Sequence, residues 1–220
     1  MEVSASLLNV KKEDAISTFY NLEAAHVDYF HIDVMDGEFV KNNTEELMSF
    51  YADTLNGITT IPLDIHLMCK NVKKCIDEFA PCAPRIINFH IESCKDGDEV
   101  MNLINHIKNS NSKVGIAINP ETPISNIFEF LPYIHSVLVM SVHPGKGGQE
   151  FIEETVSKVK TLRKYIEDRG LETEIEVDGG INLENGKKIF KAGADIATVG
   201  SFLINSKDRK YDVEQFHNLR

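Results

Sequence analysis

Short apolar runs alternate along the chain with longer segments in which apolar residues recur every three or four positions. The short runs are typical of buried strands, and eight are predicted, at residues 3–8, 29–34, 63–67, 85–89, 113–118, 136–140, 174–177 and 196–199. The longer segments are typical of amphipathic helices, with one stripe from Val100 to Ile107 and another from Ile152 to Ile166. This regular alternation predicts an α/β protein with a parallel sheet.

Two folds fit the alternation, a closed (β/α)8 TIM barrel and an open, doubly wound sheet. Polar residues favour the barrel, because pairs of them occur at the ends of the second, third and seventh strands. A barrel brings the ends of all its strands around one mouth, whereas an open sheet leaves these three harder to bring together. Since no linker or low-complexity stretch divides the chain, we predict a single (β/α)8 barrel domain over residues 1–220.

The polar pairs consist of residues that bind divalent metals well. They are His31 with Asp33, Asp64 with His66, and Glu176 with Asp178. Side chains two positions apart on a strand face the same side of the sheet, and unpaired carboxylates facing its interior are costly. Taken singly, each is typical of a core histidine or a turn-forming aspartate. Together, His31, Asp33, His66 and Asp178 predict one bound Zn²⁺, Fe²⁺, Mn²⁺ or Co²⁺ ion per subunit.

Further side chains of interest lie at the same strand ends. Methionines follow the predicted ligands of the second and third strands by two positions and end the sixth strand, as Met35, Met68 and Met140. They form either a hydrophobic collar that limits water at the mouth or ordinary core packing. His90 and Glu92 follow the fourth strand. They are either partners of the metal ligands or a buried polar pair satisfied by itself.

Glycines gather after the sixth, seventh and eighth strands. The segments are Gly145-Lys146-Gly147-Gly148, Gly179-Gly180 and Gly200-Ser201. Loops at these places in a barrel commonly bind phosphate through backbone N–H groups, and glycine permits the close approach. Each glycine pair alone is typical of a plain turn. Three of them with Lys146 predict a site for one phosphoryl group, and no dinucleotide-binding fingerprint follows the first strand.

Charge and composition argue against nucleic acid and membranes as partners. The net charge of −11 argues against nucleic acid, whose phosphates need a basic face. No apolar stretch approaches the roughly 20 residues that span a bilayer, and the first residues lack the pattern of a signal peptide. The four cysteines lie between residues 69 and 94 without a CxxC motif, which is typical of free thiols. We expect a cytoplasmic protein without a membrane partner.

Taken together, these segments resemble the signature segments of the ribulose-phosphate 3-epimerase family. The segments are HIDVMDG from His31, PLDIHLM from Pro62, SVHPGKGGQEF from Ser141, IEVDGG from Ile175 and VGS from Val199. The resemblance runs from about Ser4 to about Ser201. It implies a (β/α)8 barrel with one divalent metal, zinc or ferrous iron with manganese and cobalt also used, and a homo-oligomer of dimer to hexamer size.

The resemblance also implies the reaction and the roles. The enzyme would interconvert D-ribulose 5-phosphate and D-xylulose 5-phosphate, with Asp33 as proton acceptor and Asp178 as proton donor. His31, Asp33, His66 and Asp178 resemble the family's metal ligands. Ser6 and His66 resemble substrate-binding residues, and the glycine loops resemble its phosphate contacts. Inverting a carbon beside a ketone requires removing a proton from one face and returning one to the other, and a metal on the neighbouring oxygens would stabilise the enediolate.

The chain departs from the family pattern at Ala5, at Lys41, Glu46 and Leu47 after the second strand, and at Lys146. The altered loops keep open a 3-epimerase of a hexulose phosphate such as D-allulose 6-phosphate. A Schiff-base aldolase would need a lysine at a strand end, and the related decarboxylases an Asp-x-Lys-x-x-Asp motif that PLDIHLM lacks. The remote alternative is a non-catalytic, sugar-phosphate-binding barrel.

Overall fold

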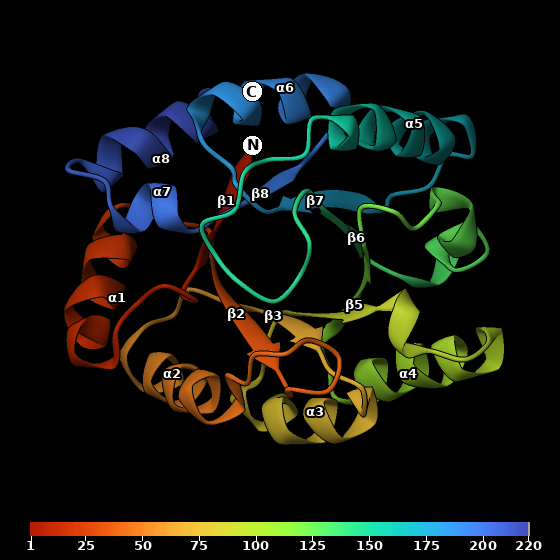
Figure 1. Ribbon diagram of the computed structural model, residues 1–220, viewed down its shortest axis with the longest axis horizontal. Coiled ribbons are helices and arrows are strands. Elements are labelled where there is room, and N and C mark those ends of the chain that lie inside the picture. Colours follow the sequence, from red (N-terminus) through yellow and green to blue (C-terminus); the bar gives the residue numbers. More distant parts are fainter. Residues whose placement is uncertain (220) are drawn as a thin grey trace.

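The computed structural model describes residues 1–219, which form a closed barrel of eight parallel strands inside a ring of helices (Figure 1). The strands are β1 (Glu2–Ser6), β2 (Tyr29–Met35), β3 (Leu63–Met68), β4 (Ile86–His90), β5 (Lys113–Ile118), β6 (Ser136–Met140), β7 (Glu174–Asp178) and β8 (Ile196–Val199). Each strand pairs with the next, and β8 pairs with β1 to close the barrel. The predicted (β/α)8 barrel is confirmed.

Helices connect the strands and cover the outside of the barrel (Figure 1). The α-helices are α1 (Ala15–Ala24), α2 (Glu45–Ile58), α3 (Val72–Phe79), α4 (Gly97–Asn109), α5 (Glu154–Asp168), α6 (Leu183–Ala192), α7 (Ser201–Ile204) and α8 (Arg209–His217). Short 3₁₀ helices are η1 (Lys12–Asp14), η2 (Ala80–Cys82), η3 (Ile91–Ser93), η4 (Ile124–Ile127) and η5 (Leu131–Tyr133). Within residues 1–219, none of these helices has both the length and the apolar character needed to cross a bilayer.

The connection between β5 and β6 differs from the prediction that every strand is followed by an α-helix. It holds only η4 and η5. Pro120, Pro123 and Pro132 lie in this segment, and proline removes a backbone donor and clashes with the preceding turn of an α-helix. The connection therefore folds as short 3₁₀ turns.

The strands have an apolar layer on their outer side, against the helices, and a partly polar layer on their inner side, within the barrel. Outward positions such as Ile32, Ile65 and Phe89 are fully buried against the helices in one large apolar core. Inward positions carry apolar residues at one level, where Tyr29, Ile86 and Ile196 pack together, and polar residues at the next levels. Because side chains alternate along each strand, the polar inward set converges on the barrel axis.

Candidate active site

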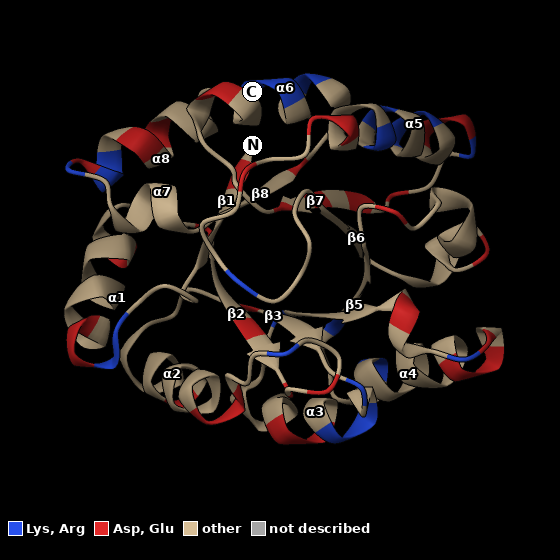
Figure 2. Ribbon diagram, in the orientation of Figure 1, with Lys and Arg blue, Asp and Glu red and all other residues tan. Residues whose placement is uncertain are grey.

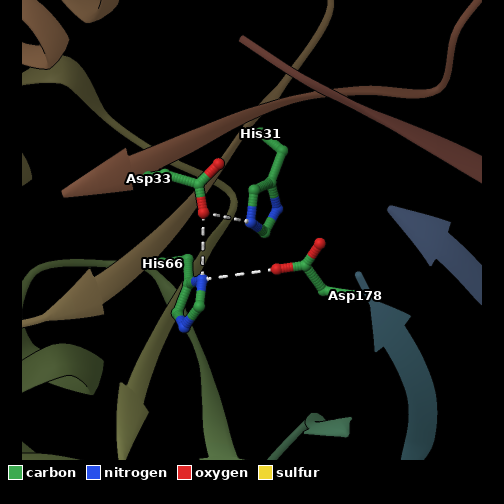
Figure 3. A group of neighbouring side chains, drawn as sticks. All are labelled: His31, Asp33, His66 and Asp178. Carbon is green, nitrogen blue, oxygen red and sulfur yellow. Dashed lines mark hydrogen bonds and ion pairs between the residues drawn. The ribbon is translucent and has the colours of Figure 1, made fainter. Parts of the chain in front are cut away.

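The four predicted metal ligands meet at the carboxyl ends of three strands. His31 and Asp33 lie on β2, His66 lies on β3 opposite Asp33, and Asp178 is the last residue of β7. Their side chains point toward one another (Figure 3), and one ligand atom from each lies within 4.8 Å of those of the other three. The barrel therefore assembles two imidazoles and two carboxylates that are far apart in the chain.

Short distances between donor atoms define the centre of this group. Asp33 Oδ1 lies 3.4 Å from His31 Nε2 and 3.2 Å from His66 Nδ1. The same His66 nitrogen lies 3.7 Å from Asp178 Oδ2. His31 Nε2 is fully buried and has no hydrogen-bond partner. A buried imidazole nitrogen without a partner, facing carboxylate oxygens, fits a divalent metal ion, which would use these atoms as ligands.

A second polar layer lies behind His31 and orients its ring. Asp64 Oδ2 accepts hydrogen bonds from His31 Nδ1 at 2.6 Å and from Ser4 Oγ at 2.8 Å. Asp64 Oδ1 accepts a hydrogen bond from Asn88 Nδ2 at 2.8 Å. Since a carboxylate only accepts, Nδ1 of His31 carries the hydrogen and Nε2 is turned toward Asp33.

His31, Asp64 and Glu176 form another close group of possible ligands. Asp64 already accepts three hydrogen bonds, and Glu176 Oε1 accepts one from Thr198 Oγ1 at 2.6 Å. Burial and the charge of Asp64 raise the pKa of Glu176 to about 8. A neutral Glu176 beside an Asp64 that already accepts three hydrogen bonds is a poor cation site, so we assign this group to the support of His31.

The protein environment moves the pKa values of the two catalytic candidates in opposite directions. Burial alone would raise the pKa of Asp33, but the positive field of the adjoining His31 and His66 holds it well below its ordinary value. Burial and the charge of Asp33 raise the pKa of Asp178 to about 7. Two carboxyl groups separated in this way can act as a base and an acid at one site.

The protein environment also moves the pKa values of His31 and His66 in opposite directions. Burial alone would lower the pKa of His31, but the charges of Asp64 and Asp33 raise it well above its ordinary value. Burial lowers the pKa of His66 to about 4, although the neighbouring Asp33 carboxylate opposes that change. The negative field at His31 thus favours a positive charge there, either a proton or a metal ion that displaces it.

A cavity open to solvent adjoins the four residues, and the other predicted site residues line it. Its lining includes Asp33 and Asp178 together with Ser6, Met35, Met68, Met140, Gly145, Lys146, Gly147, Gly148, Gly179, Gly180, Gly200 and Ser201. His31 and His66 are fully buried and do not line it. The methionines meet the cavity where the pattern placed them, since Met35 pairs with Met68 and Met140 pairs with Asp178.

The three glycine segments all line this cavity. Gly180 has a φ of +65°, and a Cβ there would lie 2.8 Å from the carbonyl oxygen of Gln149. The loops after β6 and β7 therefore touch through a position that only glycine fills. The loop between β6 and α5 extends across the mouth of the barrel (Figure 1), and its one basic position is blue in Figure 2. That residue, Lys146, is the only lysine or arginine among the described residues that line the cavity.

Sequence reasoning missed several residues of the cavity. Asn9, His143, Gln149 and Thr198 line it, and Asn42 donates a hydrogen bond of 2.7 Å to the carbonyl oxygen of Gly145. Most of these residues lie in irregular loops, where no periodicity marks the direction of a side chain. The Asn42 side chain ties the loop after β2 to the loop after β6.

The model of the Ribulose-phosphate 3 epimerase family matches residues 2–204 of this chain. The chain belongs to this family. A chloroplastic ribulose-5-phosphate-3-epimerase of Arabidopsis thaliana is 37% identical over 94% of this chain and 72% of that protein. A ribulose-phosphate 3-epimerase of Helicobacter pylori is 35% identical over 100% of this chain and 98% of the relative. One from Escherichia coli is 36% identical over 89% and 85%.

Solved structures of other enzymes share the fold of this family member. A 3-hexulose-6-phosphate synthase from Salmonella typhimurium has a TM-score of 0.71 at 13% identity, covering 100% of this chain and 98% of that chain. A 3-keto-L-gulonate-6-phosphate decarboxylase from Vibrio cholerae has a TM-score of 0.73 at 10% identity, covering 99% and 96%. At these identities the likeness shows the barrel fold alone.

Proposed function

We propose that this epimerase family member interconverts D-ribulose 5-phosphate and D-xylulose 5-phosphate by proton transfer at carbon 3, with a divalent metal ion bound. The observation that carries the proposal is the meeting of His31, Asp33, His66 and Asp178 within 4.8 Å at a cavity lined by the glycine loops. Membership of the family supplies the reaction type.

The two carboxyl groups would perform the proton transfer. Asp33 removes the proton from carbon 3 of the ribulose phosphate, and Asp178 returns one to the opposite face; the roles exchange in the reverse direction. Ser6 Oγ donates a hydrogen bond of 2.8 Å to Asp33 Oδ2, which leaves Oδ1 facing the histidines. Met35, Met68 and Met140 line the cavity and would limit water around the reacting carbon.

The donor set suits zinc or ferrous iron, with manganese and cobalt as further options. When bound by the four residues, the ion supplies Lewis-acid stabilisation of the negative charge that develops on the substrate. The glycine loops and Lys146 would bind the phosphoryl group at a distance from carbon 3, so that binding energy orients the sugar. By resemblance to the family, we further propose a cytoplasmic homo-oligomer of dimer to hexamer size.

Isotope exchange tests the reaction directly. With the metal-loaded protein and D-ribulose 5-phosphate in deuterium oxide, we expect deuterium at carbon 3 of both pentulose phosphates, because each abstracted proton exchanges with solvent before its return. NMR of the sugars measures the label. A folded, metal-loaded protein that leaves carbon 3 unlabelled refutes the proposal. Faster turnover of D-allulose 6-phosphate than of D-ribulose 5-phosphate would instead assign the hexulose phosphate as substrate.

Lys146 gives a second prediction, on substrate binding. We expect Lys146→Met to raise KM for the pentulose phosphate by about 3- to 10-fold with kcat nearly unchanged, since the charge helps the ground and transition states equally. The effect should shrink at high salt, because Lys146 is exposed. Steady-state kinetics at two ionic strengths measure it. Lys41→Met is the control, since Lys41 is an exposed lysine outside the cavity lining; an equal effect there would remove the special role of Lys146.

A further inference from the structure

A chain of hydrogen bonds leads from His66 away from the cavity. His66 Nε2 lies 2.8 Å from His90 Nε2, and His90 Nδ1 lies 3.0 Å from Glu92 Oε2. Of these three residues, His66 lies on β3, His90 is the last residue of β4, and Glu92 lies in η3. Both histidines are fully buried, and the ring of Phe39 packs on His90 with centroids 4.9 Å apart. The rings are therefore held in fixed positions.

Glu92 is anchored at the far end of this chain as an acceptor only. Its Oε1 accepts a hydrogen bond of 2.8 Å from the backbone N–H of Asn119 and another from the hydroxyl of Thr122. Burial alone would raise the pKa of Glu92, but the hydrogen bonds from His90, Thr122 and Asn119 lower it to about 2. Every neighbour of this carboxylate thus donates to it, and an ionised carboxylate has no hydrogen to give.

We propose that His90 and Glu92 are positioning residues that keep Nδ1 of His66 free of hydrogen for the metal. The inference rests on the proposed function. Because Glu92 only accepts, Nδ1 of His90 carries a hydrogen, and Nε2 of a neutral His90 accepts from Nε2 of His66. His66 Nδ1 is then the bare nitrogen, and it is the atom that lies 3.2 Å from Asp33 Oδ1 and 3.7 Å from Asp178 Oδ2.

The two ligand histidines are thus held in opposite tautomers by different partners. His31 donates from Nδ1 to Asp64 and presents Nε2, whereas His66 donates from Nε2 to His90 and presents Nδ1. The reverse arrangement at His66 would place an N–H where the proposed ion binds. A bound cation and the hydrogen-bond chain therefore require the same tautomer of His66, with its hydrogen on Nε2.

NMR of the zinc-loaded, full-length protein tests the tautomers. Two-bond proton–nitrogen correlations distinguish a protonated ring nitrogen from a bare or metal-bound one. We expect hydrogen on Nε2 of His66 and on Nδ1 of His90. Hydrogen on Nδ1 of His66 in a protein that is active and zinc-loaded would overturn the inference and leave the proposed function standing.

Metal affinity of a variant tests the role of Glu92. In Glu92→Gln the side-chain NH₂ must face a donor whichever way the amide turns, either His90 on one side or Asn119 and Thr122 on the other. We expect zinc to bind about 10- to 100-fold more weakly, measured by transfer of zinc from the loaded protein to a chromogenic chelator. Zinc affinity within twofold of the unmodified protein would refute the role.

Asp77→Asn is the matched control for loss of a histidine–carboxylate pair. Asp77 Oδ1 lies 2.6 Å from His106 Nε2, but this pair is exposed and separate from the four ligands. Its zinc affinity should be unchanged. Failure of the unmodified protein to bind zinc or to exchange the proton at carbon 3 would instead count against the proposed function.

Discussion

Asp178→Asn is expected to lower the rate of pentulose phosphate interconversion by about 10²- to 10⁴-fold, the usual contribution of a positioned acid or base. The variant should lose hydrogen exchange from only one of the two sugar phosphates. Asp33 remains, so D-ribulose 5-phosphate should still exchange its carbon 3 hydrogen with deuterium oxide, while D-xylulose 5-phosphate should not. The amide oxygen of asparagine keeps one ligand atom at the end of β7. Measuring the metal content of the purified variant separates loss of the ion from loss of the acid.

Asp33→Asn is the mirror control for this prediction. If the two carboxyl groups serve opposite faces of carbon 3, this variant should still exchange the carbon 3 hydrogen of D-xylulose 5-phosphate with deuterium oxide. It should not exchange that of D-ribulose 5-phosphate. Both variants losing exchange from both sugars, with metal retained, would contradict the assignment of one face to each carboxyl group. The one-sided pattern cannot arise from misfolding, because a misfolded barrel would lose both exchanges together.

The barrel could be predicted because its strands are short, buried and regularly spaced. All eight predicted runs fall on observed strands, with small differences at the ends: β1 ends at Ser6 and not at residue 8, and β4 extends to His90. The apolar stripe that begins at Ile152 starts before α5, whose first residue is Glu154. Element ends depend on capping and tertiary contacts, which apolar periodicity does not encode.

The convergence of the four predicted metal ligands could be predicted because alternation on a strand fixes which side chains face inward. The sequence left His90 either as a partner of the metal ligands or as half of a separate polar pair, and its specific contact with His66 could not be predicted. In the register of β3 and β4, His66 is opposite Asn88, and His90 lies two residues further along. Whether two such rings meet depends on the stagger of neighbouring strands and on their rotamers. Asn9 and Asn42 escaped prediction for another reason, since both lie in loops.

Gly115→Ala is expected to lower the free energy of unfolding by about 3–5 kcal/mol, combining overpacking with loss of a hydrogen bond to a charged group. Gly115 lies on β5 with its hydrogen atoms against the inner polar layer. A Cβ there would lie 1.7 Å from Asn88 Oδ1 and 2.8 Å from Ser136 Oγ. Asn88 would have to move away from Asp64, the residue that orients His31. Urea unfolding followed by circular dichroism measures the change.

Gly57→Ala is the control, because Gly57 lies in α2 with nothing within 4 Å of its added Cβ. Alanine should stabilise that helix by about 0.5–1 kcal/mol. The clash itself is isolated by combining Gly115→Ala with Asn88→Ala. Asn88→Ala alone leaves Asp64 Oδ1 without its donor, but it also removes the atoms that the new Cβ would meet. The double variant should therefore lose clearly less stability than the sum of the two single losses. Additive losses would mean that Gly115 is required for some reason other than the approach of Asn88. They would also mean that the layer behind the proposed metal ligands is less tightly packed than these distances imply.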